Sequence, residues 1–188
     1  MVLKRLREET RSHHERVERC FNLEARLADI GSYHELLERL IGIYEPLEAQ
    51  LELLDWNGAG IDFTARRKTP MLKRDLAALS IEGRPGADHF PRADIPRFTS
   101  LAQGWGCMYV LEGATLGGQV ISPMVRARLG LTAETGAGFF ASYGEDVGRM
   151  WKAFCSAMSA QCIEEGSICA AVGAAVETFG CFEQRLRL

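Results

Sequence analysis

Hydrophobic residues recur every three or four positions through most of the chain, which is the period of an α-helix with one buried face. The first predicted helix runs from Leu3 to about Arg19, and its apolar face carries Leu3, Leu6, Thr10, His13, Val17 and Cys20. Ser32 is expected to cap a second helix that reaches about Leu54, and Pro46 should bend or split that helix. No segment alternates with a period of two over any useful length, so the pattern predicts an all-α fold.

Further helices are predicted at Met71 to Leu79, about Phe98 to Leu129, Gly144 to Glu165 and about Ile168 to Leu188. The segment from Ser80 to Pro96 holds three of the six prolines and has no helical period. It is expected to be a connector, because too little chain precedes it to fold alone. We therefore predict a single domain over residues 1–188.

Composition and charge narrow the class of protein. Hydrophobic residues make up 47% of the 188 residues, which is enough for one substantial core. The net charge of −3 gives no electrostatic footprint for nucleic acid or an anionic membrane, and no apolar run approaches the roughly 20 residues needed to cross a bilayer. The N-terminus is charged from its start and has no apolar signal core, so we expect a cytoplasmic protein.

Six cysteines are present, none of them in a C-x-x-C pair, and in this compartment they should be thiols. Cys155, Cys162 and Cys169 recur every seven residues, which would place them on one helical face. We interpret them as small, buried apolar side chains.

The long helix that ends near Leu129 carries three glycines in its middle, Gly113, Gly117 and Gly118. A straight helix of this length would span on the order of 45 Å, so the glycines should mark a kink. Tyr109, Gly113 and Gly117 are spaced by four and share one face, which is bare backbone with a phenol at one end. Either another helix packs against this strip or a flat cofactor lies on it.

A pair of histidines in the first helix is the candidate metal site, although a histidine near an apolar seam is more often a core residue than a ligand. Periodicity places His13 nearer the centre of the apolar face. His14 has Glu18 four residues later, and a metal-bound imidazole usually donates its other N–H to such an acceptor. The two arguments point to different members of the pair.

Three stretches resemble the heme oxygenase family, specifically its bacterial branch and within it the bacteriophytochrome-associated group. LREETRSHHERVE, from Leu6 to Glu18, is similar to the family pattern L-R-x-x-T-x-x-x-H-x-x-V-E. YVLEGATLG, from Tyr109 to Gly117, is similar to Y-x-x-E-G-x-x-L-G, and FFASYGEDVGRMWKAF also looks like the bacterial branch. The resemblance covers nearly the whole chain in the right order.

The resemblance implies a helical bundle in which heme lies between the first helix and a glycine-kinked distal helix. It aligns His14, not His13, with the iron ligand, and Glu18 would orient that imidazole. Arg7 and Tyr109 correspond to residues that contact the heme propionates. Gly113 and Gly117 would be the catalytic walls that select which meso carbon of the porphyrin is oxidised. In the animal branch an aspartate follows the first glycine, but this chain has Ala114, so the source of distal protons stays open.

The resemblance also implies the reaction and its partners. Heme would be substrate and cofactor at once, and would be opened to biliverdin, carbon monoxide and ferrous iron with O2 and external electrons. The chain has no flavin or nicotinamide motif, so the electrons would come from a ferredoxin, a flavodoxin or a reductase. A bilin-binding photoreceptor is the expected user of the product. Two alternatives remain: a heme carrier or sensor that does not degrade heme, and a scaffold of the same fold without heme.

Overall fold

The structure is a computed structural model that describes residues 1–79 and 94–187. Its elements, in chain order, are α1 (Val2–Phe21), α2 (Leu23–Arg26), α3 (Ile30–Glu52), η1 (Thr64–Arg66), α4 (Thr69–Ala78), α5 (Leu101–Leu129), α6 (Gly138–Ala141), η3 (Gly144–Asp146), α7 (Val147–Gln161) and α8 (Glu165–Leu186). The described residues contain helices and no strand, so the all-α prediction is confirmed. Most of the predicted connector lies outside the described residues, and its last residues, 94–96, are not helical.

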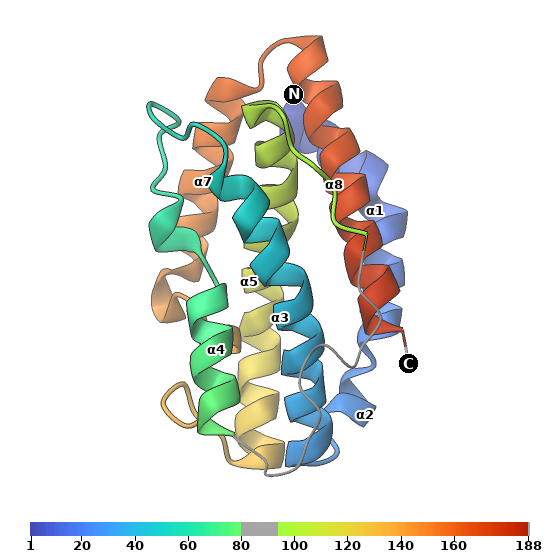
Figure 1. The fold of residues 1–188 in the computed structure, drawn as a ribbon, viewed down its shortest axis with the longest axis vertical. Coiled ribbons are helices and arrows are strands. Elements are labelled where there is room, and N and C mark those ends of the chain that lie inside the picture. Colours follow the sequence, from blue (N-terminus) through green and yellow to red (C-terminus); the bar gives the residue numbers. More distant parts are fainter. Residues whose placement is uncertain (80–93, 188) are drawn as a thin grey trace.

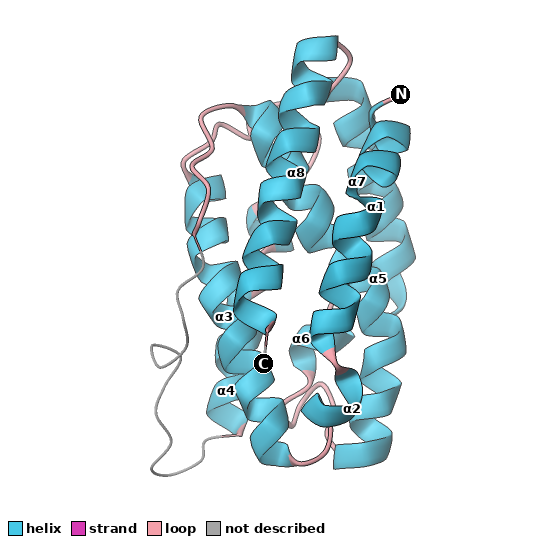
Figure 2. Ribbon diagram, turned by 90° about the vertical axis from the view of Figure 1, so that its right-hand side faces the viewer, coloured by secondary structure: helices cyan, strands magenta, loops and turns pink. Residues whose placement is uncertain are grey.

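The long helices run along the long axis of the molecule (Figure 1). α8 packs along both α1 and α5, α3 packs against α4 and α8, and α7 packs against α5. Figure 2 views the bundle from the side that carries α1 and α8. α1 and α5 each pack against α8. Among the described residues they do not pack closely against each other.

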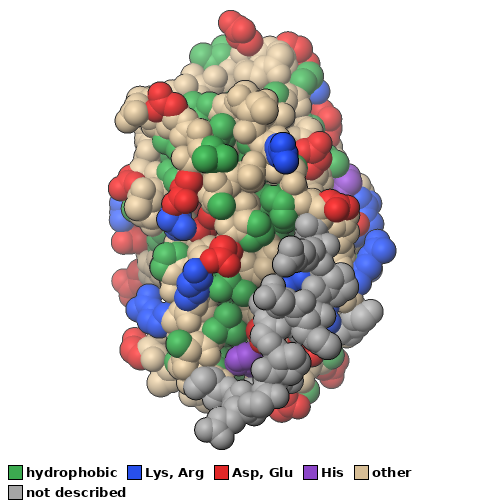
Figure 3. All heavy atoms as spheres, viewed as in Figure 1, with side chains coloured by type: hydrophobic (Ala, Val, Ile, Leu, Met, Phe, Trp, Pro, Cys, Tyr) green, Lys and Arg blue, Asp and Glu red, His purple; other side chains and the backbone are tan. Residues whose placement is uncertain are grey.

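One continuous apolar core lies between these helices. Its largest members include Trp105 of α5, Phe154 of α7 and Tyr44 of α3, each at most 1% exposed. On the face shown in Figure 3, acidic and basic side chains are interspersed around apolar ones. No helix in the described part of the chain has the length and apolarity needed to span a membrane.

Local chemistry explains where the helices begin and end. Asp29, rather than the predicted Ser32, is the N-cap of α3, and its carboxylate accepts a hydrogen bond from the Ser32 backbone N–H at 2.7 Å. α3 continues through Pro46 without a break, so the proline does not split it. α5 begins with a capping box between Ser100 and Gln103 and runs unbroken to Leu129, so a kink at its glycines stays a prediction.

The prediction that three cysteines share one helical face is wrong. Cys155 lies in α7, Cys162 ends that helix as its C-cap residue, and Cys169 lies in α8. Cys162 is buried, Cys155 is half-buried and Cys169 is exposed. The turn between α7 and α8 interrupts the seven-residue spacing, so the three cysteines do not share a helical face.

Candidate functional site

The glycines of α5 fall into two kinds. A Cβ added at Gly106 would overlap the carbonyl of Ala171 in α8, and one at Gly118 would lie 2.5 Å from the carbonyl oxygen of Phe140. Gly106 and Gly118 therefore permit close helix packing. A Cβ at Gly113 would make only ordinary contact with Trp151 at 3.8 Å. At Gly117 it would meet no described atom of another element within 4 Å.

Helix packing is therefore not the reason for glycine at Gly113 or Gly117. Both positions are spaced by four from Tyr109, so all three lie on one face of α5. Burial raises the pKa of the Tyr109 phenol, while the charge of Arg7 and a hydrogen bond with Thr10 lower it. Since Arg7 and Thr10 belong to α1, this face of α5 is turned toward α1.

We call the surface formed by Arg7, His14, Tyr109, Gly113 and Gly117 the α1–α5 face. Its α1 members, Arg7 and His14, are seven residues apart, which is two helical turns and thus the same side of the helix. The structure brings Arg7 and Tyr109 close enough for the guanidinium charge to act on the phenol. All five residues are candidates from the sequence, and the structure places Arg7 of α1 near Tyr109 of α5.

Apolar side chains continue the glycine strip. Leu116 is 40% exposed and Val120 is 66% exposed, and they lie three and seven residues beyond Gly113 on the same face of α5. Trp151 of α7 is partly buried beside the strip, with its ring 5.7 Å from the Tyr109 ring. Exposed leucine and valine next to bare backbone form an apolar surface that a flat apolar molecule can cover.

The two histidines of α1 have different surroundings. The His13 ring stacks near Phe179 of α8, and its Nδ1 lies 2.6 Å from an Arg16 nitrogen and 3.4 Å from a Glu183 carboxylate oxygen. The His14 side chain is 60% exposed, and its Nδ1 lies 3.6 Å from a carboxylate oxygen of Glu18. That distance is within ion-pair range and longer than a hydrogen bond.

His13 is thus held by polar groups of α1 and α8. His14 meets the Phe179 ring edge-to-face at 6.0 Å but keeps 60% of its side chain exposed, so its imidazole is available to a ligand. The apolar face of α1 that periodicity identified is the face that packs on α8, which explains why its central histidine is a packing residue. His14 lies at the edge of that face, on the side of Arg7.

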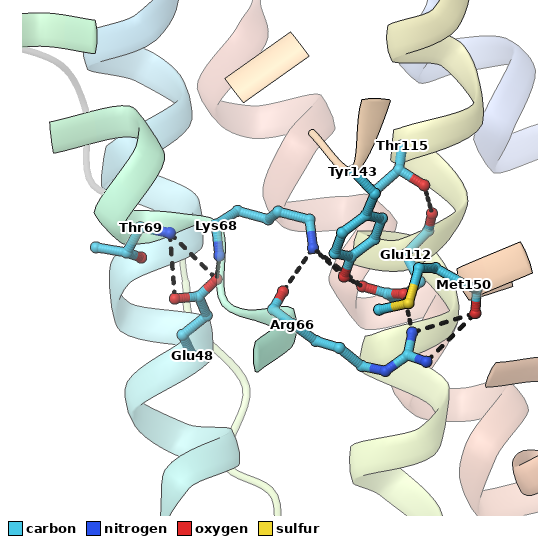
Figure 4. A network of polar contacts seen from close by, with 8 residues as sticks. All are labelled: Glu48, Arg66, Lys68, Thr69, Glu112, Thr115, Tyr143 and Met150. Carbon is cyan, nitrogen blue, oxygen red and sulfur yellow. Dashed lines mark hydrogen bonds and ion pairs between the residues drawn. The ribbon is translucent and has the colours of Figure 1, made fainter. Parts of the chain in front are cut away.

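A buried charged cluster beside the glycine strip of α5 was not predicted from the sequence (Figure 4). Glu112, which precedes Gly113, accepts hydrogen bonds from Arg66, from Lys68 at 3.1 Å and from Tyr143 at 2.7 Å. Glu48 of α3 accepts from the backbone N–H groups of Lys68 and Thr69. The sequence signal was a single glutamate within a run of apolar and small residues, which indicates a buried carboxylate that needs partners.

Neither Ala114 nor Thr115, the two residues that follow Gly113, provides a proton donor on the open side of the glycine strip. Ala114 has no ionisable group. The Thr115 hydroxyl donates to the Glu112 carbonyl at 2.6 Å, and Thr115 is buried on the side of α5 away from Gly117. There it lines a cavity of about 10 Å³ together with Lys68, which leaves room for about one water molecule at most.

This donor set fits heme better than a bare metal ion. Within residues 1–79 and 94–187, no three histidine, cysteine or acidic side chains gather as metal ligands. His14 is a single imidazole, which suits an iron that brings four porphyrin nitrogens of its own. Arg7 and Tyr109 offer a cation and a hydroxyl for carboxylates, and the glycine strip with Leu116 and Val120 offers a flat apolar wall.

Comparisons with known proteins identify the family of the chain. The heme oxygenase family model matches residues 1–187. A curated heme oxygenase from Xanthomonas campestris pv. campestris (strain 8004) is 36% identical over 102 residues, which are 53% of this chain and 56% of that protein. The match thus spans little more than half the length of that relative.

Solved structures show the same fold. The heme oxygenase of Neisseria meningitidis, determined in NO- and CO-bound forms, superimposes with a TM-score of 0.83 at 20% identity, over 99% of this chain and 90% of that one. The heme oxygenase of Leptospira interrogans gives 0.76 at 20% identity, over 98% of both chains. Because the family model covers all but the last residue, the chain belongs to the heme oxygenase family.

Proposed function

We propose that this protein is a heme oxygenase that binds heme on the α1–α5 face and opens it to biliverdin, carbon monoxide and ferrous iron. The observation that carries the proposal is the strip at Gly113 and Gly117, where an added Cβ would meet nothing closer than the ordinary contact of Gly113 with Trp151. The exposed imidazole of His14 on α1 supports it. Membership of the heme oxygenase family supports the same activity.

Each end of the α1–α5 face has a separate binding role. His14 would bind the iron, and Glu18 would hold the other ring nitrogen and so fix the orientation of the imidazole. Arg7 and Tyr109 would bind the carboxylates of the substrate at the other end. Heme supplies the iron centre at which O2 is activated, and it is also the substrate.

The remaining residues act by shape. At Gly113 and Gly117 the absence of a Cβ lets the backbone approach the porphyrin closely and leaves no room for a second substrate. Leu116, Val120 and Trp151 exclude water from the apolar edge of the ring. Selection among the meso carbons then follows from which edge of the porphyrin these walls leave open.

The proposed reaction needs a second protein. Electrons would come from a ferredoxin, a flavodoxin or a reductase, because the sequence has no flavin or nicotinamide motif. The product would serve a bilin-binding photoreceptor, as the similarity to the bacteriophytochrome-associated group implies. The compartment would be the reducing cytoplasm, which suits the six free cysteines of the structure.

A single-turnover assay tests the proposal. The purified protein is loaded with hemin, supplied with O2 and a ferredoxin–reductase pair, and the extracted pigment is identified by chromatography and mass. We expect the Soret band to disappear while biliverdin and CO form in equal amounts. A stable Soret band under reduction would identify a carrier or sensor, and the absence of any defined Soret band would identify a scaffold without heme.

A further inference from the structure

A cluster of buried charges lies next to the glycine strip of α5. Glu112, Arg66 and Lys68 are 1%, 6% and 2% exposed. Figure 4 shows the side chains of Arg66, Lys68 and Tyr143 converging on the Glu112 carboxylate from different segments. Arg66 ends η1, and Lys68 is the N-cap of α4. Tyr143 precedes η3 and α7, so the cluster joins α5 to the start of α4 and to the segment before α7.

The charged groups of this cluster are held by hydrogen bonds to one another. The Lys68 ammonium has three protons, and it donates to Glu112 Oε1 at 3.1 Å, to the Arg66 carbonyl at 2.5 Å and to the Tyr143 hydroxyl at 2.6 Å. The Tyr143 hydroxyl donates in turn to Glu112 Oε1 at 2.7 Å, and Arg66 donates to Glu112 Oε2. A carboxylate held by three donors cannot turn with its helix unless charged hydrogen bonds break in a dry environment.

Arg66 also holds the second wall of the site. Its two terminal nitrogens each donate to the Met150 carbonyl at 3.3 Å. The next residue, Trp151, lies against Gly113. One guanidinium therefore contacts α5 at the residue before Gly113 and α7 at the residue before Trp151.

We propose that Glu112, together with its donors Arg66, Lys68 and Tyr143, is a positioning device for the α1–α5 face. It fixes the rotation of α5 and the place of Trp151, so that Gly113 and Gly117 stay open toward α1. The consequence for product formation rests on the proposed heme oxygenase activity, whereas the effect on α5 itself does not.

Stability alone is a poor explanation for the cluster. Apolar residues of the same size are often at least as stabilising as a buried ion cluster, because the charges must be removed from water. Burial lowers the pKa of Lys68, and the attraction of Glu112 opposes that shift, so the ammonium depends on this carboxylate. A positioning role would explain why the Glu112 cluster lies next to the glycine strip.

The test compares Glu112→Gln with Glu48→Gln. Both residues are 1% exposed. Glu48 belongs to α3 and accepts from the backbone N–H groups of Lys68 and Thr69 and from the Arg67 guanidinium at 3.3 Å. Three quantities are measured: amide hydrogen exchange of residues 110–117 in the heme-free protein, hemin affinity, and the ratio of biliverdin isomers. The exchange measurement needs no heme and no turnover.

We expect Glu112→Gln to raise exchange in residues 110–117 about tenfold or more above Glu48→Gln, with hemin affinity changed by no more than a few-fold. Turnover should fall by up to about 100-fold, the usual cost of misplacing reacting groups by about 1 Å, and the isomer ratio should broaden. Tyr143→Phe removes one of the three donors to Glu112 and should give a smaller change in the same direction. This variant replaces Glu112→Gln in the comparison if Glu112→Gln does not fold.

Equal exchange and equal isomer ratios in the Glu112 and Glu48 variants would overturn the positioning role. If the wild-type protein makes no biliverdin, the proposed function fails, but the exchange comparison still decides whether Glu112 fixes α5. If biliverdin forms and exchange is unchanged, the positioning role fails and the proposed function stands.

Discussion

Gly117 and Gly118 are neighbours in α5 and face opposite environments. A Cβ on Gly118 would lie 2.5 Å from the Phe140 carbonyl oxygen, whereas a Cβ on Gly117 would find no described atom outside its own helix within 4 Å. Gly118 is thus required by the packing of α6 on α5. Gly117 has no such requirement in the protein alone, and the proposed heme site would supply the reason for it.

This difference predicts opposite outcomes for two substitutions. Gly117→Leu should raise the free energy of unfolding of the heme-free protein by about 0.5–1 kcal/mol, because leucine has the higher helix propensity. Its isobutyl group should occupy the distal side of the heme site and block biliverdin formation. Gly118→Ala should lower the stability instead, since its Cβ meets backbone. Thermal unfolding of both variants and turnover of Gly117→Leu check this, and a Gly117→Leu protein that makes biliverdin at the wild-type rate would mean that the strip does not face the iron.

His14 and His13 should separate in their effect on heme. His14→Ala should abolish the six-coordinate heme spectrum, because it removes the proposed axial ligand. His13→Ala should largely keep it, since His13 is engaged by Arg16 and Glu183. Absorption titration with hemin measures both variants. The reverse result would assign the iron to the histidine that packs on α8.

Glu18 should act through His14. Glu18→Ala should weaken heme affinity or activity by roughly 10- to 100-fold, the usual effect of losing the partner of a metal-bound histidine. Glu15→Ala is a matched control, because Glu15 is an exposed glutamate next to His14 without an ion pair to it in the described structure. Hemin titrations of the two variants decide, and equal affinities would show that Glu18 does not support the ligand.

The cysteines should differ in reactivity. Burial raises the pKa of Cys162 to about 11, as it does for Cys181, and raises that of Cys107 further still. These thiols should resist alkylation at pH 8, where almost none is ionised, while the exposed Cys169 reacts first. Timed iodoacetamide labelling with peptide mass analysis measures the order, and early labelling of Cys107 would show that the core opens.

Periodicity and apolar content predicted every long helix to within a few residues, because most of these helices bury one apolar face and α5 is buried nearly all round in its first half. The short α2 and α6 were not predicted, since four residues carry too little pattern. The charged cluster around Glu112 was missed for another reason. Its partner Arg66 is 46 residues away in a segment without pattern, and only the fold brings the two side chains together.

The most direct test of the account is the crystal structure of the hemin complex. We predict the porphyrin between α1 and α5, with the iron bound by a ring nitrogen of His14, Gly113 and Gly117 on the opposite face, and the propionates near Arg7 and Tyr109. A porphyrin bound elsewhere, or an iron ligated by His13 with the glycine strip uncovered, would contradict it.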